Sequence, residues 1–227
     1  MIKYNAAIFD LDGTLLDSLD VWEKVDRDFL ARRGLAVPPD YTDEVSPMSF
    51  EEAARYTAER FGLPESPAEL IREWNEMVAE EYARRIGLKP GARELLETLA
   101  GRGVRLGVAT ALPEELYGPA LRHNGIFGLF GAFASVLEGE RGKNFPDVYL
   151  LCARRLGAPP EYCAVFEDML PGLRGAKAAG MGAFGIFDRR SPLRERDALA
   201  AADGYFRSLS EIPYDALFSI RQEAGAC

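Results

Sequence analysis

Two aspartates placed two positions apart, Asp10 and Asp12, are the residues of this chain whose types and spacing point most directly to chemistry. They follow a short apolar run, residues 6–9, which predicts a buried strand, and Gly13 then lets the chain turn away. Side chains i and i+2 of a strand lie on the same side, so both carboxylates can face one small volume. Two such carboxylates repel each other unless a cation or a shared proton relieves them. The spacing predicts a reactive site, and the alternative interpretation is a loop in which both carboxylates are solvated.

Further polar residues follow other apolar runs in the second part of the chain. They are Thr110, Glu167, Asp168 and Asp188. Because ligands bind beyond the carboxyl ends of the strands in open parallel sheets, we expect these residues to meet Asp10 and Asp12 at one rim. Oxygen ligands of this kind suit Mg²⁺, which takes one or two carboxylates together with waters and a phosphate. Lys143, in the loop 139–143, is the candidate cation that would balance an anionic substrate.

The elements that must position these residues are predicted by the hydrophobic pattern. Strands are predicted over residues 6–9, 104–109, 133–137, 163–166 and 183–187, with an edge strand at 205–206. Helices are predicted between them over residues 93–100, 114–124, 147–156 and 171–179. Strands that alternate with helices indicate an α/β fold, here a doubly wound, Rossmann-like parallel sheet.

The segment between the first and second strands has a helical pattern throughout. Apolar residues recur at helical spacing from Trp22 to Phe29 and from Leu70 to Tyr82, and Pro38 opens a loop after the first of these stripes. Residues 49–52 and 66–69 both have the S-x-x-E form of a helix capping box. We therefore expect an α-helical domain, residues 17–86, inserted into a core made of residues 1–16 and 87–227. An insert at that place would overhang the carboxylates.

Composition narrows the function classes. With 27 Lys and Arg against 36 Asp and Glu, the chain has a formal net charge of −9 and no basic run. We therefore expect neither a nucleic-acid partner nor association with anionic membranes. The apolar run before Asp10 is too short for a signal peptide, and no apolar stretch is long enough to span a membrane. A core of this size favours a monomer.

Three cysteines, Cys152, Cys163 and Cys227, form no C-x-x-C pair. Cys152 and Cys163 lie in apolar segments, where we expect them to pack as small hydrophobic side chains. This cysteine usage suits a reducing compartment, and we expect a cytoplasmic protein.

Taken together, the motifs resemble those of the haloacid dehalogenase superfamily of phosphatases and phosphomutases, over nearly the whole chain. The first motif is Asp10-Leu11-Asp12-Gly13-Thr14, the second is Thr110, the third is Lys143 with Pro146 and Asp147, and the fourth is Glu167-Asp168 with Gly172 and residues 178–181. They occur in the family's order, each at a predicted strand end or loop. The helical insert resembles the cap of the subgroup that includes beta-phosphoglucomutase-like phosphatases.

The resemblance implies a role for each matching residue. Asp10 would be the nucleophile that forms an aspartyl-phosphate, and Asp12 would act as general acid and base. Asp10, the Asp12 backbone carbonyl and Asp168 would hold Mg²⁺, with Glu167 in support. Thr110, Ala111 and Lys143 would bind the phosphoryl oxygens.

Two departures from the family's patterns bear on the reaction. Asp12 favours phosphoryl transfer, because the family's dehalogenases lack this acid-base aspartate. The related sugar-phosphate mutases carry a histidine in the first cap helix, where this chain has Trp22, and the cap loop at residues 46–49 lacks the arginine that such mutases use. Met169 stands where the family often has a small polar residue.

We therefore predict a Mg²⁺-dependent phosphatase, a phosphoric monoester hydrolase that acts on a small phosphorylated metabolite. Alternatives are a sugar-phosphate mutase and a non-catalytic phosphate-binding protein. The candidate substrate residues of the cap are Trp22, Ser46, Met48 and Ser49.

Overall fold

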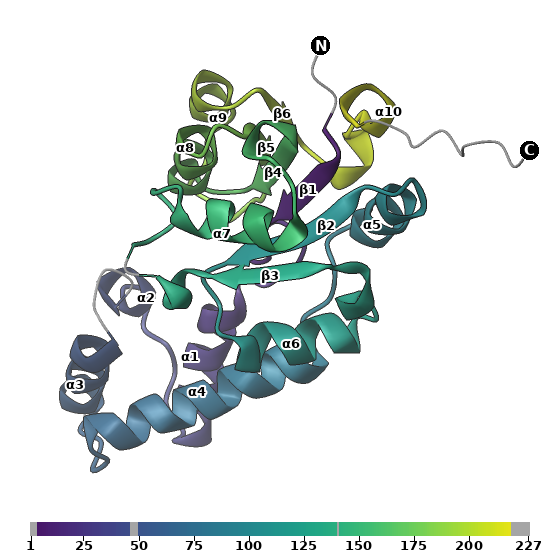
Figure 1. The fold of residues 1–227 in the computed structure, drawn as a ribbon. Helices are drawn as coiled ribbons and strands as arrows, with labels where there is room; N and C mark the ends of the chain where they lie inside the picture. The colour runs from purple at the N-terminus through teal and green to yellow at the C-terminus, as the bar shows by residue number, and fades with distance from the viewer. Residues whose placement is uncertain (1–3, 46–49, 140, 219–227) are drawn as a thin grey trace, which may run out of the picture. The chain divides into compact units, whose positions relative to one another are not determined.

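The computed structural model describes residues 4–45, 50–139 and 141–218. It divides into two compact units, which are described separately (Figure 1). The core unit comprises Met1–Leu19 and Ile86–Cys227, and the helical unit comprises Asp20–Arg85. Ser46, Met48 and Ser49, which were candidate substrate residues, and the terminal Cys227 lie outside the described residues. Within the described ranges, no helix combines the length and the apolar character needed to cross a bilayer.

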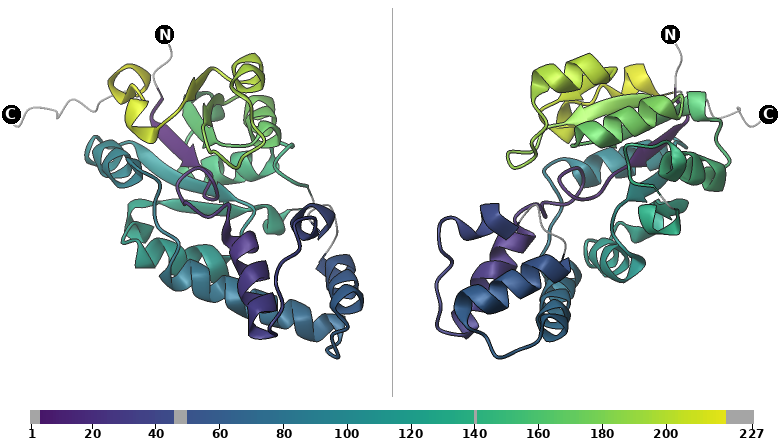
Figure 2. Two further views of the ribbon diagram at one scale, coloured as in Figure 1. Left: turned by 180° about the vertical axis from the view of Figure 1, so that it is seen from behind. Right: turned by 90° about the vertical axis from the view of Figure 1, so that its left-hand side faces the viewer.

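A six-stranded parallel sheet forms the centre of the core unit (Figure 1). The strands are β1 (Ala6–Phe9), β2 (Arg105–Thr110), β3 (Ala132–Ser135), β4 (Cys163–Glu167), β5 (Gly182–Ile186) and β6 (Gly204–Phe206), in the order β3-β2-β1-β4-β5-β6. Helices lie on both sides of this sheet (Figure 2). They are α5 (Ala92–Gly101), α6 (Glu114–His123), α7 (Asp147–Leu156), α8 (Leu170–Ala178) and α9 (Glu195–Ala201), with the short α10 (Tyr214–Leu217) near the end. The predicted doubly wound parallel sheet is confirmed.

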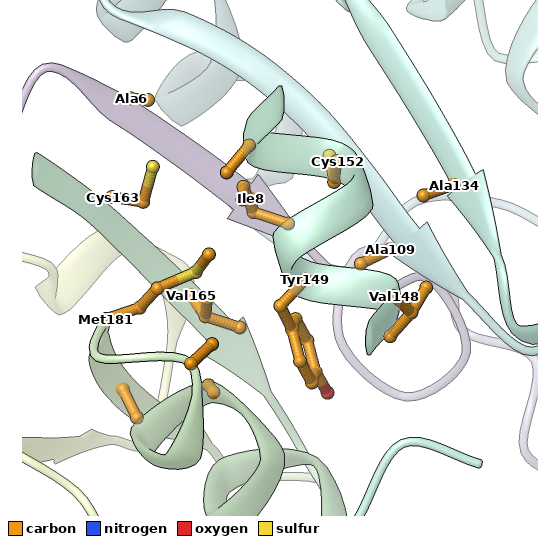
Figure 3. Close-up of a cluster of buried hydrophobic side chains, with 14 of the residues drawn as sticks. Ala6, Ile8, Ala109, Ala134, Val148, Tyr149, Cys152, Cys163, Val165 and Met181 are labelled. Atoms are coloured by element: carbon orange, nitrogen blue, oxygen red, sulfur yellow. The ribbon is translucent and has the colours of Figure 1, made fainter. Parts of the chain in front are cut away.

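The alternation of side chains along the strands builds a separate apolar layer on each face of the sheet. On one face, Ile8 and Val165 belong to one buried apolar cluster with Val148 and Cys152 of α7 (Figure 3). Residues of the same strands that point the other way build the second layer. There the rings of Phe9 and Phe166 stack at 4.9 Å, and Phe184 continues the stack at 5.4 Å. Central strands buried on both faces explain the continuous apolar runs in the sequence.

Cys152 and Cys163, the cysteines that the structure describes, behave as the sequence predicts. Cys152 and Cys163 are fully buried free thiols. Burial raises the pKa of Cys152 to about 12, so this thiol stays protonated and packs as a small hydrophobic side chain.

The strand β3 ends two residues earlier than its apolar pattern predicts. The sequence predicts a strand over residues 133–137, but β3 ends at Ser135, and Val136–Glu138 form a 3-10 turn. The Ser135 hydroxyl accepts a hydrogen bond from the Leu137 amide, and the Ser135 amide donates to the Glu138 carboxylate. This reciprocal capping box starts a helical turn at a position where two apolar residues suggest a continuing strand.

The helical unit contains α1 (Val21–Arg32), α2 (Tyr41–Val45), α3 (Phe50–Phe61) and α4 (Pro67–Arg84). The predicted capping box at Ser66 is present, since its hydroxyl accepts from the Glu69 amide and its amide donates to the Glu69 carboxylate. The short α2 was not predicted, because the sequence indicates a loop after Pro38. Phe29 of α1 packs edge-on against Trp74 of α4 at 5.6 Å, as the two apolar stripes predict.

Asp26 on α1 is expected to make the stability of this unit depend on pH. Burial, with repulsion from Glu23, raises the pKa of Asp26 to about 6. A raised pKa in the folded state means that the carboxyl contributes its full stability below its ordinary pKa of about 4 and loses it as the pH rises through about 6. Asp26→Asn should therefore raise the free energy of unfolding at pH 7 by about 1 kcal/mol, less than the full pKa difference implies, because the carboxyl still reaches water.

Urea unfolding of Asp26→Asn and of the parent protein at pH 3.5 and pH 7 measures this effect. Asp28→Asn on the same helix is the matched control, because Lys24 lowers the pKa of that carboxyl and the control should not gain stability at pH 7. An Asp26→Asn gain of equal size at both pH values would contradict the assignment.

Candidate active site

The order of the strands reverses between β1 and β4, the place where open α/β sheets bind ligands. Asp10 follows β1 directly, Glu167 is the last residue of β4, and Asp168 comes next. All three side chains are buried, and their carboxylates offer oxygens that lie within 4.8 Å of one another. The structure thus brings together three acidic residues that the sequence placed at strand ends. We call them the carboxylate cluster.

Lys143 supplies a positive charge to the carboxylate cluster. Its ammonium group contacts the carboxylate of Asp10 and donates to Glu167 Oε1 at 2.6 Å. Burial acts to lower the pKa of Lys143, but the charges of Asp10 and Glu167 outweigh it and raise the pKa above its usual value. Lys143 is therefore a fixed cation at any working pH.

Glu167 is held from two further directions. The Tyr149 hydroxyl, on α7, donates to Glu167 Oε1 at 3.0 Å, and the Met169 amide donates to Oε2 at 3.3 Å. Gly172 on α8 makes room for this carboxylate, because a Cβ at that position would lie 2.2 Å from its carboxyl carbon. With both oxygens occupied, Glu167 is less available to an incoming ligand than Asp168.

Asp168 is the carboxylate that most clearly fits a metal ion. Both of its oxygens are buried, and neither has a hydrogen-bond partner among the described residues. Burial, then the charges of Asp10 and Glu167, raise its pKa above the usual value for aspartate. Buried carboxylate oxygens that lack partners are costly unless a cation takes the place of the missing donors. Hard oxygen donors at this spacing fit Mg²⁺.

Gly13 explains how the loop after β1 comes so close to Asp168. Its φ of 77° lies in the left-handed region, and a Cβ there would lie 2.5 Å from Asp168 Oδ2. Only glycine meets both conditions. The loop closes on itself, because the Leu11 carbonyl accepts from the amides of Leu15 and Leu16, at 2.9 and 2.8 Å.

The carboxylate of Asp12 has a different environment from that of Asp10. Asp12 Oδ1 accepts a hydrogen bond from the buried Ser18 hydroxyl at 2.5 Å. Asp12 is not one of the three residues of the carboxylate cluster. The two aspartates that open the motif are therefore held by different partners, Asp10 by Lys143 and Asp12 by Ser18.

Two other residues that the sequence places at strand ends make contacts outside the carboxylate cluster. Thr110, the buried last residue of β2, accepts a hydrogen bond from the Leu112 amide at 3.1 Å, and Ala111 follows it on the exposed side of the turn. Asp188 after β5 pairs with Lys89 at 2.7 Å and is not part of the carboxylate cluster. Burial acts to raise the pKa of Asp188, but Lys89 and the Arg190 amide outweigh it and lower the pKa.

Trp22, the candidate substrate residue that the structure describes, is 40% exposed on α1. Sequence reasoning missed Ser18, Lys89, Tyr149 and Ser191, whose contacts join segments that no local pattern connects. Ser191 donates to the backbone carbonyl of Asp168 and lies 3.6 Å from the sulfur of Met169. Of these residues, only Ser18 could have been found from the sequence, because its hydroxyl follows closely after the aspartate pair.

Known proteins resemble this chain in both sequence and fold. The family model for haloacid dehalogenase-like hydrolases matches residues 4–180. The fructose-1-phosphate phosphatase YqaB of Escherichia coli is 30% identical over 187 residues, which cover 81% of this chain and 97% of that protein. The crystal structure of CbbY from Rhodobacter sphaeroides in complex with phosphate has a TM-score of 0.72 and 26% identity, covering 92% of this chain and 96% of its own.

A third similar protein is a hydrolase of the same family from Deinococcus radiodurans, whose crystal structure has bound phosphate and sodium. Its TM-score is 0.74 at 25% identity, and the match covers 95% of this chain and 96% of that chain.

Because both oxygens of Asp168 lack partners among the described residues, we expect the stability of this protein to depend on Mg²⁺. Asp168→Asn removes a charge from the carboxylate cluster, so it should stabilise the metal-free protein. Because the pKa of Asp168 is raised, its contribution to stability is present at acidic pH and is lost as the pH rises, and the gain should be larger at pH 8 than at pH 4. Saturating Mg²⁺ should stabilise the parent protein, by about 2.7 kcal/mol at 100 times Kd, and leave the variant nearly unchanged.

Thermal unfolding with and without Mg²⁺ measures both effects. Asp215→Asn, which alters an exposed acid of the core unit outside the cluster and outside the motifs, is the control and should keep the full response to Mg²⁺. Equal stabilisation of the parent protein and Asp168→Asn by Mg²⁺ would exclude Asp168 as a ligand.

Gly175 on α8 controls the position of the Lys143 loop. A Cβ at this position would lie 2.0 Å from the Lys143 carbonyl oxygen and 2.8 Å from that of Phe145. Backbone atoms cannot turn aside as side chains do, so Gly175→Ala should displace the loop and destabilise the protein by about 1–3 kcal/mol. Gly101→Ala at the end of α5 is the matched control, since no described atom beyond its chain neighbours and its own helix backbone lies within 4 Å of its Cβ position. Chemical unfolding measures the free energy of unfolding of both variants. A loss in Gly175→Ala no greater than that in Gly101→Ala would contradict the close approach of α8 to the Lys143 loop.

Proposed function

Because the chain belongs to the haloacid dehalogenase-like hydrolases, we propose that it is a Mg²⁺-dependent phosphatase of small phosphorylated metabolites. The prediction of a hydrolase of this superfamily is confirmed by the family match. The observation that carries the finer proposal is the buried carboxylate cluster, in which Asp168 offers two unpartnered oxygens beside Asp10. Phosphate bound to the similar proteins from Rhodobacter sphaeroides and Deinococcus radiodurans supports it.

In the proposed reaction the first step transfers the phosphoryl group to Asp10. A carboxylate oxygen of Asp10 bonds to phosphorus, while the bond from phosphorus to the leaving oxygen breaks. Asp12 gives its proton to that oxygen, which leaves as an alcohol. The hydrogen bond from Ser18 orients the Asp12 carboxylate for this transfer.

The second step releases phosphate and restores the enzyme. Asp12, now ionised, takes a proton from a water molecule as the water oxygen bonds to phosphorus. The bond between phosphorus and Asp10 then breaks, and inorganic phosphate leaves. The same carboxyl group acts as acid and then as base, so it must stay apart from the metal-binding carboxylates, as the Ser18 contact favours.

Mg²⁺, when bound, would neutralise the charge that sets a carboxylate against a phosphate. Asp10, Asp168 and the backbone carbonyl of Asp12 would hold it, with Glu167 in support. Lys143, Thr110 and Ala111 would bind the phosphoryl oxygens, and the raised pKa of Lys143 supports its role as a permanent charge there.

The similarity to a fructose-1-phosphate phosphatase favours a phosphorylated sugar among the metabolites. Trp22, Ser46, Met48 and Ser49 are the proposed contacts of the leaving group, with the helical unit acting as a cap. The free thiols of Cys152 and Cys163 support the proposed cytoplasmic placement, and the self-contained core supports a monomer.

The nucleophile assignment predicts the outcome of one substitution. Asp10→Asn should lower kcat for phosphate release by about 10³-fold or more, because a carboxamide does not form the acyl-phosphate bond. Circular dichroism should show an unchanged fold. The control is Asp17→Asn, an exposed aspartate of the same segment, which should retain activity.

Phosphate release from a panel of sugar phosphates and other phosphorylated metabolites, with and without Mg²⁺, tests the function itself. Isomerised hexose phosphate without free phosphate, in the presence of a catalytic bisphosphate, would identify a mutase instead. Phosphate binding without turnover across the whole panel would identify a non-catalytic protein.

A further inference from the structure

Lys89 is a largely buried lysine of the core unit that has no role in the proposed mechanism. Its side chain is 12% exposed, and its ammonium group donates to the carbonyls of Gly13 and Phe187 and to Asp188 Oδ2, at 2.6, 2.8 and 2.7 Å. An ammonium group has three donors, and all of them are used here. Lys89 thereby joins the loop after β1 to the end of β5, two segments more than 170 residues apart in the chain.

The contact with Gly13 acts on the loop that carries the aspartate pair. Gly13 follows Asp12, whose backbone carbonyl is a proposed metal ligand, and its Cα faces Asp168 at close range. Lys89 also pairs with this loop through its backbone, since its amide donates to the Leu15 carbonyl at 2.8 Å. The side chain and the backbone of Lys89 therefore fix the same loop at two points.

The contact with Asp188 acts on Asp168 from the other side. Asp188 Oδ1 accepts a hydrogen bond from the Arg190 amide at 2.9 Å, which closes a turn after β5. In that turn Ser191 donates to the backbone carbonyl of Asp168. The pair of Lys89 and Asp188 therefore supports the turn that holds the backbone of the unpartnered carboxylate.

We propose that Lys89 is a positioning residue of the active site, which fixes the spacing between the loop of Asp12 and Gly13 and the backbone of Asp168. A buried ion pair contributes little net stability by itself, since the charges lose their hydration. Its contribution here is geometric, because metal sites depend on the residues that orient their ligands. The inference rests on the proposed function for its kinetic readout, whereas its binding readout needs no substrate.

Mg²⁺ titration calorimetry on folded, metal-free protein tests this role. Lys89→Met should raise the Kd for Mg²⁺ about tenfold, the lower end of the effect of losing a residue that orients metal ligands. Asp188→Asn, which keeps the shape and removes the partner charge, should raise it in the same direction. Lys177→Met is the matched control, because it breaks an exposed lysine–aspartate pair, with Asp203, and should leave the Kd unchanged.

Kinetics separate positioning from substrate binding. In Lys89→Met, kcat at saturating Mg²⁺ should fall about tenfold while KM stays within twofold, because the proposed role involves no contact with substrate. Lys89→Arg should recover only part of the loss, since a planar guanidinium cannot follow the three directions of an ammonium group.

A Kd for Mg²⁺ within twofold of the parent protein in both Lys89→Met and Asp188→Asn would overturn the inference. If Lys89→Met does not fold, Lys89→Arg and Asp188→Asn decide on the same criterion. Normal Mg²⁺ binding by the parent protein without any phosphate release would contradict the proposed function alone, whereas a parent protein that binds no Mg²⁺ would overturn both.

Discussion

Mutual repulsion among the carboxylates of Asp10, Glu167 and Asp168 is the constraint on which the rest of this structure depends. Three buried acidic groups with oxygens within 4.8 Å cannot all ionise without a compensating charge. Lys143 compensates part of the negative charge, through its contacts with Asp10 and Glu167. The two oxygens of Asp168 are left without a donor among the described residues. The imbalance of charge that remains is the physical basis for the proposed divalent cation at this place, because unpaired buried charges cost stability.

Close approach of glycine backbone to the atoms of the site and of its supporting loop is what allows so many charges to share one volume. Gly13 lets the loop after β1 reach Asp168, Gly172 leaves room for Glu167, and Gly175 lets α8 lie against the Lys143 loop. At each of these positions a Cβ would lie 2.5 Å or less from an atom of the site or of its supporting loop. The glycines therefore set the distances between the charged groups, because a larger residue at any of these positions would push the neighbouring segments apart.

The sheet and the strand-end positions of Asp10, Glu167 and Asp168 could be predicted because they depend on local signals: apolar runs, their alternation with helical periods, and polar residues where the runs stop. Parallel strands carry their carboxyl ends to one edge, so local signals suffice to place the acids together. The partners could not be predicted. The ion pair of Lys143 with Glu167 and that of Lys89 with Asp188 join distant segments of the chain, and no local signal indicates them. Such pairings depend on side-chain reach between distant segments, and the early end of β3 depends on a capping box that competes with an apolar pattern.

The contacts of the carboxylate cluster with Lys143 and Tyr149 are made within the core unit. The charge arrangement is thus built by the core itself. The two segments that join the core unit to the helical unit nevertheless contact the aspartate loop. Ser18, just before the helical unit, donates to Asp12, and Lys89, just after it, donates to the Gly13 carbonyl. A change in the backbone of either segment must therefore act on Asp12, the proposed general acid and base, or on the peptide of Gly13. Because Ser18 and Lys89 both belong to the core unit, their contacts fix the aspartate loop at the two points where the chain leaves the core unit and returns to it.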